Sequence, residues 1–257
     1  MKVLIFGGAT EGRRLSAALS KDGIDVTLSV ATEFGRDLSA SDRVIVISNR
    51  LDKEGMIEVL RKGAFDYIID ATHPYAVLAS QNIRSACHAT GLKHLRLKRP
   101  ESAVTPGAIY AEDAVAAAGI LKKNNERVLL TIGSKELKPF TRVENYAERF
   151  FVRILPMQDS LKKALDLGFR CSNIICMQGP FDSEMNTATL KMTGAKFLVT
   201  KDSGDAGGFE AKVSAAFSLG CEIIVIARPV EDPVQEKTYM FDELLEYFNV
   251  KEIQEEI

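Results

Sequence analysis

A glycine-rich turn near the amino terminus is the first feature that could do chemistry. It reads Gly7-Gly8-Ala9-Thr10-Glu11-Gly12 and follows the short apolar run 3–6. Glycines let the backbone approach a phosphate closely, and the next helix would offer free N–H groups and the positive end of its dipole. The spacing departs from G-x-G-x-x-G, because the second glycine comes one position early. The turn predicts a site for the diphosphate of a dinucleotide; the alternative is a tight strand–helix turn without a ligand.

Two side chains of this turn could add to the predicted site. Thr10 could cap the following helix or bond a phosphate oxygen. Glu11 could return a hydrogen bond to the backbone of the first helical turn. The predicted cofactor-binding residues of the turn are Gly7, Gly8, Ala9, Thr10, Glu11 and Gly12.

The end of the second apolar run, 26–30, bears on which dinucleotide would bind. Folds that bind NAD usually place an Asp or Glu there, on the ribose 2′-hydroxyl. Here the run contains Ser29, the first carboxylate after it is Glu33, and Arg36 follows. Small hydroxyl side chains and an arginine suit a 2′-phosphate better, so Ser29 and Arg36 predict NADPH as the cofactor. The alternative for Arg36 is a solvated loop charge.

A polar string with one of only three histidines follows the apolar run 67–69. It reads Asp70-Ala71-Thr72-His73-Pro74-Tyr75. Ligands of open α/β sheets bind at the carboxyl ends of the strands, so we expect Thr72, His73 and Pro74 beside the cofactor or substrate. Pro74 is expected to begin the following helix, where its missing N–H costs nothing. The alternative is a capping Thr and a partly buried His held by a backbone hydrogen bond.

Three polar turns follow apolar runs in the second half of the chain, at 131–135, 178–181 and 200–208. They carry lysines and several backbone donors, a combination that suits carboxylates. The alternative is solvated loops whose glycines serve only the turn geometry. The predicted substrate-binding residues are Ser134, Lys135, Arg153, Lys201, Asp202, Ser203 and Gly204.

The elements that would position these residues alternate between strand and helix. The apolar runs are continuous, as expected for strands covered on both faces. The rhythm loosens over 100–110 and then restarts. We therefore predict an α/β protein with two Rossmann-like, doubly wound, mostly parallel sheets and a cleft between them. The predicted domains are 1–110 for NADPH and 111–257 for the substrate.

Composition excludes several classes of function. The formal net charge of −2 gives no support to nucleic-acid binding. The basic cluster at 93–99 lacks interleaved aromatic residues and is interpreted as a strand with a solvated edge. No apolar run approaches the roughly 20 residues that span a bilayer, and no signal peptide is apparent, so a cytoplasmic protein is expected. No Cys/His cluster has metal-ligand spacing, so no protein-bound metal is expected. A monomer or small homo-oligomer is the expected state.

Taken together, these strings resemble the precorrin-6A reductase family of corrin (vitamin B12) biosynthesis, almost end to end. The strongest signal is the string 70–75, followed by a helix and then by Leu95-Arg96-Leu97-Lys98-Arg99-Pro100. Many relatives carry a Leu-Ala-Gly-Arg-like string after the second strand, where this chain has a longer loop before Arg36. The other matching strings are 7–12, 50–52, 133–135, 179–181 and 200–204.

The resemblance implies NADPH-dependent hydride transfer to a double bond of a macrocycle, from precorrin-6A to precorrin-6B or in the cobalt-bearing counterpart. It also implies a large anionic tetrapyrrole substrate, whose carboxylates Lys135, Lys201 and Arg153 would neutralise. His73 is the best-placed candidate for a catalytic proton donor. The alternative function is a Rossmann module that senses NADP without catalysis.

Overall fold

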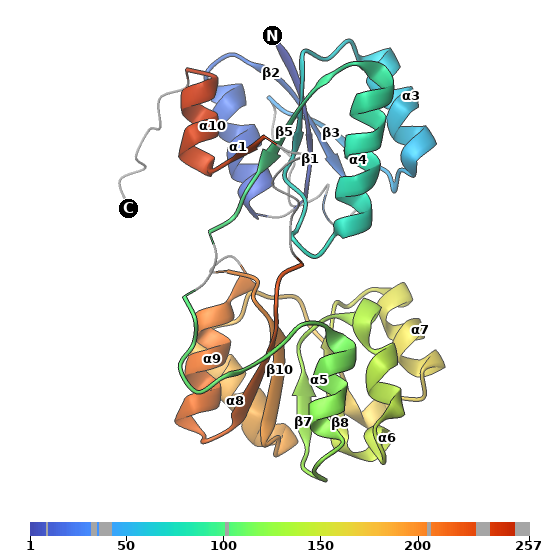
Figure 1. The fold of residues 1–257 in the computed structure, drawn as a ribbon, viewed down its shortest axis with the longest axis vertical. Coiled ribbons are helices and arrows are strands. Elements are labelled where there is room, and N and C mark those ends of the chain that lie inside the picture. Colours follow the sequence, from blue (N-terminus) through green and yellow to red (C-terminus); the bar gives the residue numbers. More distant parts are fainter. Residues whose placement is uncertain are drawn as a thin grey trace. The chain divides into compact units, whose positions relative to one another are not determined.

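The computed structural model describes residues 1–8, 10–31, 35, 43–100, 103–204, 207–229 and 237–249 (Figure 1). The chain forms two compact units. Unit 1 consists of Met1–Pro100 and Pro229–Ile257, and unit 2 consists of Glu101–Arg228. Each unit is built around one six-stranded sheet in which every strand pair is parallel. The predicted α/β class with two Rossmann-like sheets is confirmed.

The sheet of unit 1 has the order β12-β5-β4-β1-β2-β3. The order reverses between β1 and β4, which is the topological switch point where ligands bind in folds of this type. The turn 7–12 leaves β1 and the string 70–75 leaves β4, so the sequence places both at this switch point. The strands are β1 (Lys2–Phe6), β2 (Asp25–Val30), β3 (Ile45–Ser48), β4 (Tyr67–Asp70), β5 (Lys93–Leu97) and β12 (Thr238–Tyr239).

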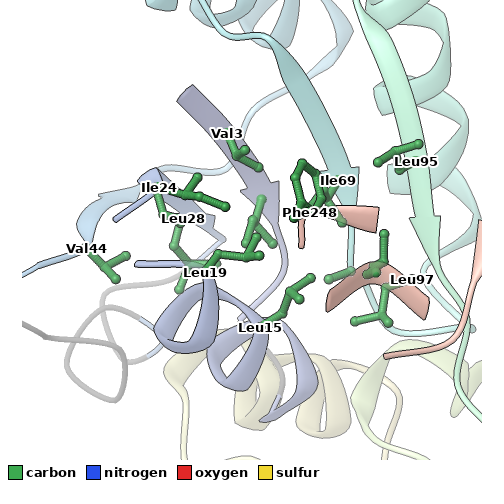
Figure 2. Packing of buried hydrophobic residues seen from close by; sticks show 14 of the residues in the cluster. Val3, Leu15, Leu19, Ile24, Leu28, Val44, Ile69, Leu95, Leu97 and Phe248 are labelled. Carbon is green, nitrogen blue, oxygen red and sulfur yellow. The ribbon is translucent and has the colours of Figure 1, made fainter. Parts of the chain in front are cut away.

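Helices cover both faces of this sheet. Side chains alternate along a strand, so Val3 and Ile5 face one layer of helices while Leu4 and Phe6 face the other. The first layer is α1 (Thr10–Lys21) with α10 (Phe241–Tyr247), and the second is α3 (Lys53–Gly63) with α4 (Val77–Thr90). Figure 2 shows the first layer, with Leu15 and Leu19 of α1 against the strands. Burial on both faces explains why the strands read as continuous apolar runs.

Unit 2 repeats the arrangement with the order β6-β11-β10-β7-β8-β9. Its switch point lies between β7 and β10. The strands are β6 (Ile109–Ala111), β7 (Val128–Leu130), β8 (Phe150–Ile154), β9 (Ile174–Cys176), β10 (Phe197–Lys201) and β11 (Glu222–Ile226). The α-helices are α5 (Ala114–Leu121), α6 (Tyr146–Arg149), α7 (Gln158–Asp166), α8 (Ser183–Thr193) and α9 (Phe209–Ser218). Short 3-10 helices are η1 (Ser134–Glu136), η2 (Lys138–Arg142) and η3 (Cys171–Asn173).

The division of the chain differs from the predicted domains 1–110 and 111–257. The strand β6 pairs with β11, so residues 109–111 belong to unit 2. The end of the chain returns to unit 1, where β12 pairs with β5 and α10 packs against α1. Sequence analysis missed β12 because it has only two residues, and it missed α10 because the helix is short. Among the described residues, no helix has the length and apolar character needed to cross a membrane.

Replacing Leu244 in α10 with Ala is expected to destabilise unit 1 by about 2–5 kcal/mol, as for other fully buried leucines. Leu244 is fully buried in the same cluster as Leu15 and Leu19 of α1. The measurement is urea denaturation followed by circular dichroism, because the chain has no Trp. Glu246→Ala, at an exposed position of the same helix, is the control. Equal midpoints for the two variants would contradict the role of α10 in the core.

Candidate functional site

The glycine turn after β1 passes close to the end of β4. The Gly7 N–H donates to the Ser29 carbonyl at 3.0 Å, which joins the turn to β2. A Cβ on Gly7 would lie 2.5 Å from the Ala71 carbonyl oxygen, and one on Gly12 would lie 2.7 Å from the Gly7 carbonyl oxygen. Side chains at these two positions would therefore collide with backbone. The glycines let the turn carry its backbone N–H groups to the switch point and let α1 begin directly behind it.

Charged side chains support the turn in ways that differ from the sequence expectations. The Glu11 carboxylate forms an ion pair with the Arg99 guanidinium at 3.0 Å, so the predicted return bond to the backbone is replaced by a tertiary contact. Arg13 Nη1 donates to the Gly8 carbonyl at 3.3 Å and adds positive charge beside the turn. Thr10 is the first residue of α1 and is exposed, while Ala9 lies outside the described residues.

A buried ion pair fixes the end of β4. Arg96 of β5 is 2% exposed and Asp70 is fully buried, and Nη1 of Arg96 lies 2.8 Å from Oδ1 of Asp70. The same Nη1 lies 3.1 Å from the Thr72 carbonyl and 3.2 Å from its hydroxyl. Asp70 Oδ1 also accepts the Thr72 N–H at 2.9 Å. One guanidinium therefore sets the path of the chain into the His73 string. The interpretation of 93–99 as a strand with a solvated edge was wrong for Arg96 and Arg99, which are buried.

His73 is held by the backbone that follows it. Its Nδ1 accepts the Tyr75 N–H at 3.3 Å, which assigns the neutral ring's proton to Nε2. The His73 carbonyl accepts the Ala76 N–H at 2.7 Å and closes a turn before α4. The helix therefore begins at Val77, and the prediction that Pro74 starts it was wrong. Pro74 and Tyr75 form the turn that presents the half-buried imidazole.

In unit 2, the loops after β7 and β10 meet through an ion pair. Lys201 Nζ lies 2.6 Å from the Glu136 carboxylate, so the predicted substrate cation has an acidic partner that sequence analysis missed. Asp202 pairs with Arg228 at 3.0 Å. Lys135 is exposed. Ser134 begins η1 and is half-buried, and Ser203 and Gly204 continue the loop after β10. These contacts bring the predicted loops to one edge of the sheet.

Arg153 lies deeper than these loops. It is 6% exposed, and its Nη2 donates to Asn186 Oδ1 at 2.8 Å. Its guanidinium lies 4.3 Å from the centre of the Phe181 ring. Burial lowers the pKa of Arg153 to about 10. Two residues before it, Phe151 packs into the cluster formed by α8 and α9, so Arg153 faces the same helices.

Lys212 of α9 is a second buried cation on this face, and sequence analysis missed it. It is 8% exposed, and its Nζ lies 3.5 Å from Thr200 Oγ1. Burial lowers the pKa of Lys212 to about 8, and the positive charge of Arg153 adds to the effect. A signal existed in the sequence, because Lys212 shares the apolar stripe of α9 with Phe209 and Ala216 at helical spacing.

Two of the predicted cofactor-binding residues lie in β2 and in the segment that follows it. Arg36, the predicted 2′-phosphate residue, lies outside the described residues. Ser29 is buried in β2 beside the glycine turn. Over the ranges that the structure describes, no group of three or more His, Cys, Asp or Glu side chains is arranged to hold a metal ion.

Comparison with known proteins identifies the family. Residues 2–249 match the family described as Precorrin-6x reductase CbiJ/CobK, a span that includes strands of both sheets. The chain belongs to this family. It is therefore an oxidoreductase, a precorrin-6A reductase of cobalamin biosynthesis. The alternative of a non-catalytic NADP-sensing module is set aside, because the family consists of reductases.

Individual relatives agree along most of the chain. The reductase is 35% identical over 230 residues to the cobalt-precorrin-6A reductase of Salmonella typhimurium. The alignment covers 88% of this chain and 87% of the relative. It is 32% identical over 238 residues to the precorrin-6A reductase of Rhodococcus erythropolis, and that alignment covers 91% of this chain and 92% of the relative. A solved structure of CobK precorrin-6A reductase has a TM-score of 0.77 at 24% identity, with 97% of this chain and 96% of that chain covered, and shows the same fold.

Replacing Arg96 with Met is expected to destabilise unit 1 by about 3–5 kcal/mol, because the Asp70 carboxylate would stay buried without its cation. Urea denaturation measures the loss. Adding Asp70→Asn should recover part of it, since the Asn oxygen can still accept the Thr72 N–H. Lys98→Met, at an exposed neighbouring position, is the control. If the losses of unfolding free energy in Arg96→Met and Asp70→Asn simply added in the double variant, the two side chains would not act as a pair.

Proposed function

We propose that this reductase uses NADPH, and that the turn 7–12 of unit 1 binds the diphosphate of the cofactor. The observation that carries the proposal is the close approach of Gly7 and Gly12 to backbone at the switch point of the sheet. Only glycines leave this turn open for phosphate oxygens between the end of β1 and the start of α1. Arg13 beside the turn adds a positive charge that suits a diphosphate.

The choice of NADPH over NADH rests on the region after β2. Ser29 lies at the end of β2, next to the turn, and no Asp or Glu takes the usual place of the ribose-binding carboxylate in this strand. We assign the 2′-phosphate to Arg36 and to the hydroxyl side chains that precede it. The cytoplasmic location and the monomeric or small homo-oligomeric state stay predictions.

When bound, NADPH would supply the hydride that reduces a double bond of the macrocycle. The residues of the chain would position the ring, balance its charge and deliver a proton. We propose His73 as the proton donor. Its Nδ1 faces the Tyr75 N–H, so Nε2 is the ring nitrogen that would give up a proton, and it would do so from the imidazolium form of the ring. Thr72 and Pro74 would hold the edge of the same subsite, and the ion pair of Arg96 with Asp70 keeps this segment in place.

The substrate that we propose is precorrin-6A or its cobalt-bearing form, a macrocycle with several carboxylates. The chain is similar to reductases named for each form. Any cobalt would arrive with the substrate. The exposed Lys135 and the loop after β10, with Lys201, Asp202, Ser203 and Gly204, would contact carboxylates at the rim of unit 2. Lys201 would act from a position fixed by Glu136.

NADPH is expected to bind at least about tenfold more tightly than NADH, a difference of about 1.4 kcal/mol. The measurement is the fluorescence of the reduced nicotinamide in a titration with pure protein. Arg36→Ala should remove most of the preference, because the 2′-phosphate loses its cation. Arg61→Ala, an exposed arginine of α3, is the matched control. Equal dissociation constants for the two cofactors in the wild type would contradict the assignment of NADPH.

His73→Asn is expected to lower kcat by about 100-fold, within the range typical of general acid catalysis, and to leave NADPH affinity unchanged. The Asn oxygen can take over the hydrogen bond from the Tyr75 N–H, while the Nε2 donor is lost. Steady-state kinetics under anaerobic conditions with precorrin-6A measure the effect. His88→Asn, at an exposed position of α4, is the control. An unchanged kcat would show that water, and not His73, delivers the proton.

A further inference from the structure

Arg153 and Lys212 bring two positive charges into the interior of unit 2. Both side chains are more than nine-tenths buried. Among the residues that the structure describes, no carboxylate lies within ion-pair distance of either cation. Buried charges in proteins are ordinarily paired, because an isolated one loses its hydration without compensation. A pair of like charges is the least favourable arrangement, so this cluster points to an anion.

The hydrogen-bonding atoms of the two cations are only partly used. Nη2 of Arg153 donates to Asn186, but Nη1 is buried and has no hydrogen-bond partner among the described residues. Within the described parts of the chain, Lys212 Nζ has one polar contact, with Thr200 Oγ1 at 3.5 Å, a long distance for a hydrogen bond. Both cations therefore retain donors for a further acceptor.

Residues of the loop after β9 pack against the cluster. The ring of Phe181 covers the Arg153 guanidinium. The backbone of Gly208 packs against the same loop, since a Cβ there would lie 3.5 Å from the Pro180 side chain and 3.4 Å from the Phe181 carbonyl. Gly208 precedes α9 without a side-chain cap, so the first N–H groups of that helix add partial positive charge near Lys212.

We propose that Arg153 and Lys212 form a buried subsite for one carboxylate side chain of the tetrapyrrole substrate. The proposal rests on the proposed function, and it adds Lys212 to the residues that select the macrocycle. A carboxylate on a short aliphatic arm fits because its negative charge would offset part of the positive charge of the two cations. Its two oxygens match the free donors on Arg153 and Lys212, and the arm would contact Phe181.

The test compares Lys212→Met with Lys191→Met, the same change at an exposed position of α8. For Lys212→Met, the KM for precorrin-6A should rise at least about tenfold, as expected for the loss of one charge-assisted contact, while kcat and NADPH affinity stay near the wild-type values. The melting temperature of the substrate-free protein should rise, because a buried charge without a partner is removed. A merely structural role would lower it.

The pH dependence gives a second readout. The pKa of Lys212 in the folded protein, about 8, lies below the usual lysine value of 10.5, because the side chain is buried and lies near the Arg153 charge. The cost of burying the charged amine is therefore fully present below about pH 8, and it fades as the pH rises toward the pKa of the unfolded chain. The melting temperature of Lys212→Met should exceed that of the wild type most at about pH 7 and least at about pH 10.

Binding without turnover separates this proposal from the proposed function. The polycarboxylated tetrapyrrole uroporphyrin should raise the melting temperature of the wild type and of Lys191→Met more than that of Lys212→Met. An inactive wild type with NADPH and precorrin-6A would contradict the proposed function and leave this comparison valid. Normal wild-type turnover with an unchanged KM in Lys212→Met would overturn the subsite alone. The subsite would also be overturned if acetate or phosphate raised the melting temperature of the wild type while uroporphyrin stabilised the wild type and Lys212→Met equally. That result would indicate a site for small anions.

Discussion

The ion pair of Asp70 and Arg96 is the interaction on which the framework of unit 1 depends. It is buried, and the same guanidinium also contacts the carbonyl and hydroxyl of Thr72. Several hydrogen bonds from one group offset the desolvation of the two charges. The pair fixes where the chain leaves β4, and Gly7 crosses that point so closely that a Cβ would strike the Ala71 carbonyl. The glycine turn and the His73 string are therefore one framework.

The two units use the same strand order but treat buried charge in opposite ways. In unit 1, the buried Arg96 and Arg99 each pair with a carboxylate of the chain, and the two ion pairs support the ends of β4 and β1. In unit 2, Arg153 and Lys212 are both buried on the side covered by α8 and α9, and the charge of Arg153 helps to lower the pKa of Lys212. The chain keeps this unfavourable pair at the end of the sheet where ligands bind in such folds. Buried charge is therefore paired within the chain in unit 1 and gathered as like charges in unit 2.

The return of the chain to unit 1 has a consequence for folding. The core of unit 1 includes Leu244, Leu245 and Phe248, which are made after the whole of unit 2. Its edge strand β5 is covered by β12, with Arg96 N–H donating to the Lys237 carbonyl and Lys98 N–H to that of Tyr239. The first hundred residues therefore lack part of their core and one strand neighbour until residues 238–248 have been made. We expect unit 2, which is continuous in sequence, to be able to complete its core first.

The sequence by itself determined the strand–helix alternation, the two parallel sheets and the placement of the glycine turn and the His73 string at strand ends. These features follow from local patterns, because continuous apolar runs and turn residues act over a few neighbouring positions. Only the tertiary structure decided which charges are buried. Arg96 meets Asp70 across 26 positions, and Lys212 approaches Arg153 from another element. The spacing within α9 indicates that Lys212 is buried, but no local pattern shows which residue it meets, and a buried and a solvated arginine look alike in sequence.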